Sequence, residues 1–443
     1  MEKILMFSSA DEVRTGKVLR FIIPTYLTSL FSTLYTIVDG IFVSSYVGTN
    51  ALAAINIVYP IVNILTGIAL IFATGGSAVA TLLIGGRKNE EANKTFSVSI
   101  LFSLFAGCLV SLIVALNLND VLRMLGATLV TMEDCRTYAF WWLIATPLVI
   151  IKELFIYFIR ADGSPTYSFL TALAGGIYNI VLDYTLISRF HLGLQGAAIA
   201  TVLGILLSCC MGIYYFSKRR KTLRFTIHGL NALLGLRCMV NGTSEFVNQM
   251  AIAITTIVFN RTAMAFAGED GIAAVSIIMY LQFLVIGIYF GFSMGIAPPL
   301  GYAYGGEKLE VCKVLESYAR RFFTAAPFVL YAVTYIFAPL GVSFFSQPGS
   351  NVYAMAISGM RWYGLGFLFS GFNIFSAVRF MAYGKGHLSG IITFLRSFVL
   401  LILFLIILPQ FWELRGVWLS VPFAEGLTLF VSIGVSVYDL RKE

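Results

Sequence analysis

The chain has 443 residues, of which 58% are apolar and 12% are charged, and its formal net charge is +8. Soluble domains carry about 25% charged residues, and the mean hydropathy here is +0.86. Apolar runs of about 18 residues or more, the length of a bilayer-spanning helix, recur along the whole chain. This pattern excludes an ordinary soluble protein and predicts a polytopic helical membrane protein.

The N-terminal sequence MEKILMFSSADEVRTGK lacks the apolar core of a cleavable signal peptide. We therefore expect the first apolar run to direct its own insertion. The six cysteines show no metal-binding spacing and are interpreted as reduced packing residues. No segment is large enough to form a soluble domain.

Loop and charge signals divide the chain into twelve predicted spans. They are 18–46, 52–84, 96–118, 137–160, 166–188, 195–216, 240–264, 272–303, 322–345, 356–380, 388–410 and 416–437. The predicted fold is an all-α integral membrane protein.

The basic residues orient these spans. With a cytoplasmic N-terminus, 24 of the 30 Lys and Arg, Arg396 among them, fall on the inner side and 6 on the outer side. This asymmetry predicts a bacterial cytoplasmic (inner) membrane protein with both termini in the cytoplasm. It explains the net charge without a nucleic-acid partner. The longest basic cluster, SKRRKTLR (217–224), is expected to orient the chain and to contact anionic membrane lipids.

The sequence contains an internal repeat. A shift of 220 residues aligns 36–90 with 256–310 without a gap, with 15 of 55 positions identical. The repeat predicts an N-terminal six-helix half (1–216), a cytoplasmic linker (217–239) and a C-terminal six-helix half (240–443). Each half holds an even number of spans, so a pseudo-two-fold axis along the membrane normal should relate them, as in secondary transporters.

Polar residues recur at one depth in the N-terminal half. Asp39 and Asp183 precede the outer ends of the first and fifth spans, and Thr201 follows the outer start of the sixth. At a rise of about 1.5 Å per residue, all three lie roughly 9–14 Å below the outer surface. Asn179 is one turn from Asp183 and Tyr35 one turn from Asp39, so each pair shares a helix face.

These side chains offer oxygen ligands for a hard monovalent cation, and two close carboxylates also favour holding a proton. Insertion scales assign about 2.5–3.5 kcal/mol to a charge at a helix centre, so an intramembrane acid suggests a function. The alternative is that both acids hydrogen-bond locally and only fix helix packing. The residues alone predict an ion-coupled transporter with a site in the N-terminal half.

Several stretches resemble one transporter family. They are DGIFVSSYVGTNALAAINIVYPI, RADGSPTYS, NIVLDYTLI, LGLQGAAIATVLG and LRGVWLSVPFAEG. They resemble the multidrug and toxic compound extrusion (MATE) family, on its DinF-like bacterial side, over nearly the whole chain. The most specific motifs are N-x-x-x-D in the fifth span and G-A-A-x-A-T opening the sixth.

The resemblance implies a function and a site. It implies an antiporter that exports small organic, often cationic, compounds in exchange for Na⁺ or H⁺ by alternating access. It also implies that the Na⁺ or proton site of the N-terminal half consists of Asp39, Asn179, Asp183 and Thr201. Beyond the coupling ion we expect no cofactor, no nucleotide and no partner subunit, so that the chain acts as a monomer.

The chain departs from the family pattern in its C-terminal half. Some members carry carboxylates on both the seventh and tenth spans, but here Glu245 occupies the seventh and residues 351–380 contain no acid. A complete second cation site is therefore not expected. Glu245 could face the cavity and meet a cationic substrate, as could Tyr35, or could be paired structurally. Glu153 follows a lysine that would neutralise it, and Glu425 is left unassigned.

Other classes are less well supported. GFSMG (291–295) fits the G-x-S-x-G pattern of serine hydrolases, but a histidine base is required and the three histidines lie in loops or at span ends. No nucleotide-binding G-x-x-x-x-G-K-[ST] motif occurs, which argues against an ATP-driven pump. The chain is not expected to be an enzyme. The two-half repeat favours alternating access over a channel.

The main rival is a flippase for lipid-linked oligosaccharides or polysaccharides of the same broad superfamily. Such proteins often have fourteen spans and a basic cavity for pyrophosphate. Twelve predicted spans with acidic intramembrane groups favour cationic cargo.

Overall fold

The chain is helical almost throughout. The computed structural model describes residues 13–47 and 49–440, and these ranges contain no strand. The N-terminal half comprises α1 (Thr15–Tyr46), α2 (Thr49–Gly85), α3 (Asn89–Leu116), α4 (Leu118–Met124), α5 (Met132–Ala161), α6 (Pro165–Asp183), η2 (Tyr184–Arg189), α7 (Gly193–Tyr214) and η3 (Tyr215–Arg219). The C-terminal half comprises α8 (Ala232–Gly305), α9 (Leu309–Ser343), α10 (Asn351–Tyr363), η4 (Gly364–Gly366), α11 (Phe367–Ala382), α12 (Gly386–Phe394), η5 (Leu395–Val399), α13 (Leu400–Ile407) and α14 (Pro409–Leu440).

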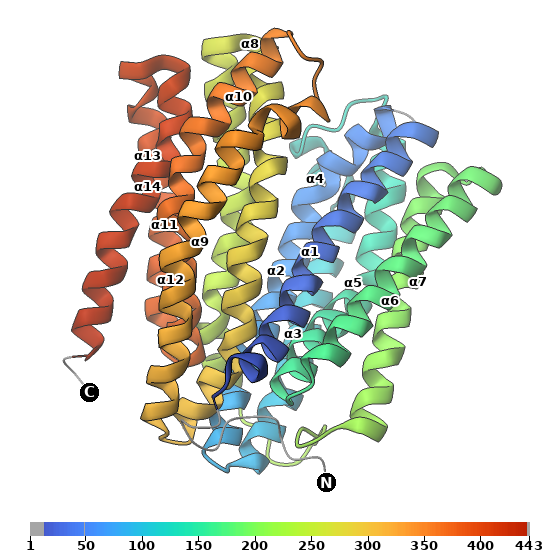
Figure 1. Cartoon of the computed structure of the whole chain (residues 1–443). Coiled ribbons are helices and arrows are strands. Elements are labelled where there is room, and N and C mark those ends of the chain that lie inside the picture. Colours follow the sequence, from blue (N-terminus) through green and yellow to red (C-terminus); the bar gives the residue numbers. More distant parts are fainter. Residues whose placement is uncertain (1–12, 48, 441–443) are drawn as a thin grey trace.

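The predicted twelve spans are confirmed. Ten helical stretches among the described residues are long and apolar enough to cross a membrane. One of them, α8, is two helices joined at Gly268, whose backbone (φ 61°, ψ −150°) is not helical. The 32-residue helix α1 completes the set. Figure 1 shows these helices as two bundles, blue to green and yellow to red.

The largest boundary error is at the ninth span. It was predicted to begin at 322, but α9 begins at Leu309. The extra turns carry charged residues such as Arg320 and Arg321. Hydropathy excludes these residues from a span, but Arg is a good helix former, so the helix continues beyond the apolar segment.

The backbone confirms the internal repeat. Residues with positive φ are uncommon outside glycine, yet here they recur in pairs. Arg87 and Glu307, with φ of 61° and 56°, stand 220 residues apart, the offset of the sequence repeat. Three further pairs stand 220 to 223 residues apart: Gly193 and Glu413, Gly163 and Gly384, and Gly126 and Gly349. The two halves therefore turn in the same way between corresponding helices.

Each half has its own apolar core. Phe96 and Phe158 pack with ring centroids 4.9 Å apart in the N-terminal half, and Phe292 stacks on Phe322 at 4.0 Å in the C-terminal half. The third helix of each half, α3 and α9, exposes apolar side chains, as at Phe105. Exposed apolar side chains on a spanning helix suit contact with lipid.

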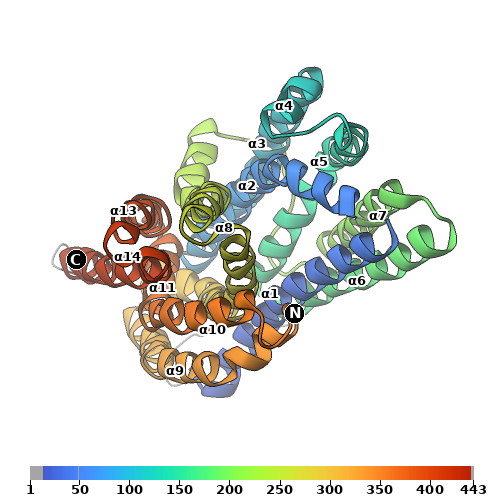
Figure 2. The same cartoon turned by 90° about the horizontal axis from the view of Figure 1, so that it is seen from above.

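The halves pack on each other through glycines. A Cβ on Gly75 of α2 would lie 2.4 Å from the backbone nitrogen of Gly242 in α8. The repeat-related contact, between Gly295 of α8 and Ile22 of α1, would bring a Cβ within 2.7 Å of the Ile22 Cα. Small residues allow such close backbone approach. Figure 2 shows α8 beside α1 and α2 where the bundles meet.

The closest approach lies where α2 and α8 end. A Cβ on Gly85 would be 2.0 Å from the Tyr302 carbonyl oxygen, and one on Gly305 would be 2.0 Å from that of Leu82. Both pairs are related by the 220-residue repeat, so the pseudo-two-fold axis runs between them. The crossing lies at the end where α1 begins and α14 ends, at the bottom of Figure 1. The halves are thus joined tightly at the end that the basic residues predict to be cytoplasmic.

We expect Gly305→Ala to lower the midpoint of thermal unfolding in detergent. The added Cβ would overlap a backbone oxygen that cannot rotate away, and overpacking costs about 1–3 kcal/mol. Gly287→Ala in the same helix is the matched control, because a Cβ there meets nothing within 4 Å. Equal midpoints for the two variants would contradict the close crossing.

Candidate functional site

Helices α6 and α7 approach closely because glycines lie between them. A Cβ on Gly204 would be 2.7 Å from the carbonyl oxygen of Gly175 and 2.9 Å from the Cβ of Asn179. One turn further along α7, Ser208 Oγ donates a hydrogen bond to the Thr171 carbonyl at 3.1 Å. This packing brings polar side chains of the two helices into contact inside the N-terminal half.

The structure brings Asn179 and Thr201 together. Asn179 Nδ2 donates to Thr201 Oγ1 over 3.4 Å, and Thr201 Oγ1 donates to the Ala197 carbonyl at 3.0 Å. Asn179 is 4% exposed, and its Oδ1 accepts no hydrogen bond from the described part of the chain. Buried polar atoms without a partner are rare in proteins. This oxygen is therefore well suited to a cation or to a donor on a bound molecule.

Asp183 is the last residue of α6 and is fully buried, with 0% exposure. It lies one turn beyond Asn179 and shares its helix face. The π-helical turn η2 follows it directly, and π segments inside helices often mark functional sites. The chain thus holds a carboxylate away from both water and lipid, one helical turn from Asn179.

Asp39 lies in α1, but its side chain is outside the described residues. The depth of the Asp39 backbone within the bundle follows from the packing of α1 on α6. At this contact, a Cβ on Gly176 would be 2.4 Å from the Phe31 ring. Both helices run the same way from this contact. Asp39 comes eight residues after Phe31 and Asp183 seven after Gly176, so at about 1.5 Å per residue their backbones reach similar levels. Tyr35 is half-buried, with its ring 6.1 Å from that of Phe31. Contact between the two carboxylates stays a prediction.

A further charged pair lies in the N-terminal half. Lys152 Nζ is 2.7 Å from Glu153 Oε1 on α5, and both side chains are largely buried. The salt bridge supplies the neutralisation that the sequence suggested for Glu153.

The C-terminal half contains a cavity of about 180 Å³. It lies between α8, α11, η5 and α14, and its charged lining residues are Glu245, Arg396 and Glu425. Aromatic side chains form much of the remaining wall: Phe259, Phe283, Phe290, Tyr363 and Phe367. Glu245 therefore faces a cavity, one of the two roles considered for it.

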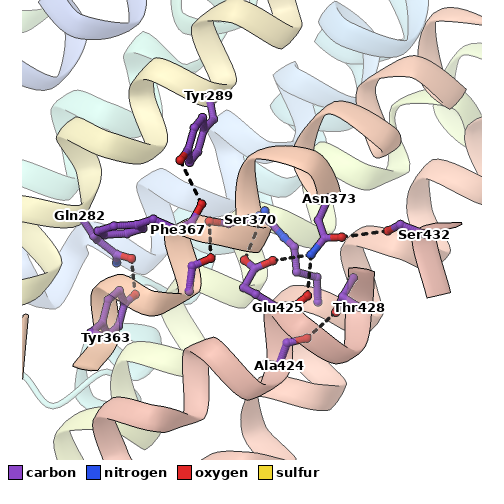
Figure 3. A network of polar contacts seen from close by, with 12 residues as sticks. Gln282, Tyr289, Tyr363, Phe367, Ser370, Asn373, Ala424, Glu425, Thr428 and Ser432 are labelled. Carbon is purple, nitrogen blue, oxygen red and sulfur yellow. Dashed lines mark hydrogen bonds and ion pairs between the residues drawn. The ribbon is translucent and has the colours of Figure 1, made fainter. Parts of the chain in front are cut away.

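Glu425 is held in a polar network, which Figure 3 shows from close by. Asn373 Nδ2 donates to Glu425 Oε2 at 2.8 Å and to its carbonyl oxygen at 2.9 Å. Ser432 Oγ donates to Asn373 Oδ1 at 3.1 Å. Arg396 Nη1 lies 3.6 Å from Glu425 Oε1.

The assignment of Arg396 to the inner side was wrong. The residue lies in η5, in the middle of the eleventh span, and lines the cavity. The signal was a lone arginine in the apolar run IITFLRSFVLLILFL. Intramembrane bases suggest function as acids do, but a count of basic residues treats each as a loop charge.

The GFSMG pattern is explained by packing. Ser293 is buried, and Cβ atoms on Gly291 and Gly295 would lie 2.6 and 2.7 Å from α1 backbone carbons. The three histidines are exposed: His191, His228 and His387. The pattern therefore reflects the contact between α8 and α1.

The fold and these buried polar groups define a two-half helical membrane protein of the kind that forms secondary transporters. The family model MatE matches residues 24–185 and 245–407. The chain belongs to the MatE family of membrane transporters and is not an enzyme.

Curated relatives match over nearly their full length. Multidrug export protein MepA of Staphylococcus haemolyticus (strain JCSC1435) is 26% identical over 435 residues, covering 96% of this chain and 93% of MepA. MepA of Staphylococcus aureus (strain bovine RF122 / ET3-1) is 25% identical over 442 residues, with the same coverage.

Solved structures share the fold. A crystal structure of MATE in complex with MaL6 superposes with a TM-score of 0.92 at 23% identity, covering 100% of this chain and 99% of that one. An outward-facing multidrug resistance MATE family transporter of the MOP superfamily gives 0.91 at 23% identity with the same coverage.

Proposed function

We propose that this chain is a secondary active antiporter that exports small organic compounds, mainly cations, in exchange for Na⁺ or H⁺. The observation that carries the proposal is the fully buried Asp183 beside the Asn179–Thr201 contact. The names of the MepA relatives supply the multidrug class.

The coupling ion binds in the N-terminal half. Asp39, Asn179, Asp183 and Thr201 supply its oxygen ligands, and a bound Na⁺ or proton cancels one of the two negative charges that the carboxylates carry. Binding of the ion removes the repulsion between the two carboxylates and allows α1 and α6 to rearrange. Because the loaded and empty forms then favour different arrangements of the halves, ion entry drives substrate exit.

The orientation follows from the basic residues. Both termini lie in the cytoplasm of a bacterial cell, and the protein is a monomer in the cytoplasmic (inner) membrane among its lipids. The tight crossing near Gly85 and Gly305 is then at the cytoplasmic end, so the arrangement described here is closed toward the cytoplasm. Tyr35 and Glu245 contact the substrate from the two halves.

The flippase alternative is less well supported. A pyrophosphate-linked lipid needs a basic cavity, whereas the C-terminal cavity carries two carboxylates and one guanidinium. Its remaining charge is negative and favours a cation.

The test is transport in sealed vesicles loaded with a fluorescent organic cation. Na⁺ and pH gradients are imposed separately, and we expect one of them to drive dye movement against its own gradient. Dye movement that does not change when either gradient is imposed would contradict the antiport mechanism. Flipping of a cell-wall lipid precursor, with no dye movement, would establish the rival function.

A further inference from the structure

The fifth helix of each half carries a charged residue within its span, an acid in the N-terminal half and a base in the C-terminal half. In the N-terminal half, Asp183 directly precedes the π turn η2 of the fifth helix. In the C-terminal half, Arg396 lies inside the π turn η5 of the eleventh. The two residues do not occupy equivalent positions, because the 221-residue offset of Gly163 and Gly384 places Asp183 opposite Phe404 and Arg396 opposite Gly175. The fifth helices of the two halves therefore carry charges of opposite sign at different levels.

Arg396 is directed at one carboxylate. Its Nη1 lies 3.6 Å from Glu425 Oε1, is buried, and has no hydrogen bond within the described ranges. Asn373 Nδ2 donates a hydrogen bond to the other Glu425 oxygen at 2.8 Å, and Ser432 Oγ donates one to Asn373 Oδ1. The Glu425 carboxylate is thus held in place by Asn373 (Figure 3). Its charge is offset by the covalently attached guanidinium of Arg396.

Glu245 is in a different position. It lines the same cavity, is 7% exposed, and is close enough to Arg396 for the guanidinium to stabilise its charged form. The charged groups of the cavity are therefore two carboxylates and one guanidinium, which leaves one negative charge in excess when both carboxylates are ionised. Aromatic walls would hold a flat or quaternary cation through cation–π contacts.

We propose that Arg396 is a tethered cation that limits the C-terminal cavity to cargo with a single positive charge. The inference rests on the proposed export of organic cations. It adds that Arg396 determines how many positive charges an exported cation carries. Because the guanidinium is covalently attached, the Glu425 position binds no exchangeable ion. Glu245 is then the carboxylate of this half that binds the cationic cargo.

The test compares two ligands of one shape class in the purified full-length protein. Benzyltrimethylammonium carries one charge, and its para-bis(trimethylammoniomethyl)benzene analogue carries two. Arg396→Gln leaves both carboxylates uncompensated, so calorimetric titration should show the ratio of dication to monocation affinity rising at least about tenfold, as expected for one charge gained within a few ångströms at an effective dielectric constant near 20. An unchanged ratio would overturn the inference.

Matched variants control for folding. Arg396→Lys keeps the charge, and Arg396→Gln combined with Glu425→Gln removes one charge of each sign, so both should keep the wild-type ratio. Glu425→Gln alone leaves the cavity neutral and should shift the ratio toward the monocation, which tests the inference even where Arg396→Gln does not fold. If the binding ratio shifts but no dye is exported in vesicles, the proposed transport function is wrong, whereas the inferred limit on ligand charge is still supported.

Discussion

Asp183→Asn is expected to remove gradient-driven export of a cationic dye while the protein still inserts and folds. Asparagine matches the shape of the fully buried side chain but carries no negative charge to be neutralised by an entering ion. The loaded and empty forms then no longer differ at this site, and the coupling disappears. Coupling free energies of about 1–3 kcal/mol correspond to 5- to 150-fold effects, so export should fall by that order. Dye efflux from sealed vesicles measures it.

Two further variants make this result interpretable. Asp39→Asn should behave like Asp183→Asn, because its backbone lies at a similar level on the neighbouring helix. Asp120→Asn replaces an exposed aspartate on α4 and should export at the wild-type rate. Dye exchange without any gradient should persist in Asp183→Asn, which separates lost coupling from lost substrate binding. Wild-type rates in both the Asp39 and Asp183 variants would refute the assigned site.

Much of the fold could be predicted from the sequence because the membrane imposes one simple rule. Apolar runs of spanning length become helices, and the 220-residue repeat then fixes the symmetry of the two halves. The start of α9 was missed because its charged turns are helical outside the apolar segment. The break at Gly268, which divides α8 into two spans, coincides with the predicted loop between 264 and 272.

The candidate site could be predicted only where neighbouring helices share a short connection. Asp183 and Thr201 lie on α6 and α7, which a few residues join, so counting from their common turn gives both depths. In the structure the hydrogen-bond partner of Thr201 is Asn179, one turn further from that end. The Arg396–Glu425 pair was not found in this way. Depth does not give the rotation of a helix about its own axis, which determines whether a buried charge faces a cavity or a partner.

The RADGSPTYS motif also has a structural role that could not be predicted from the sequence. Its Asp162 is 2% exposed in the turn between α5 and α6. Its carboxylate accepts hydrogen bonds from the backbone nitrogens of Lys221, Thr222 and Leu223 at 2.7, 2.8 and 2.9 Å, and from the Tyr215 hydroxyl at 2.8 Å. Burial raises the pKa of Asp162, and these donors act against that rise. Asp162 thus fastens the linker between the halves to the N-terminal half.

Asp162→Ala is accordingly expected to release this linker. Three backbone N–H groups would lose their acceptor, and hydrogen bonds to a charged group contribute about 1.5–3 kcal/mol each. The linker segment SKRRKTLR offers several trypsin sites, so limited proteolysis of the purified protein should cut it at least about tenfold faster than in the wild type. Asp162→Asn keeps one acceptor oxygen and should give an intermediate rate. If all three proteins are cut equally fast, the linker is held by other contacts, such as the bond from the Arg224 backbone nitrogen to Asn93 Oδ1 at 2.7 Å, and Asp162 does not anchor it.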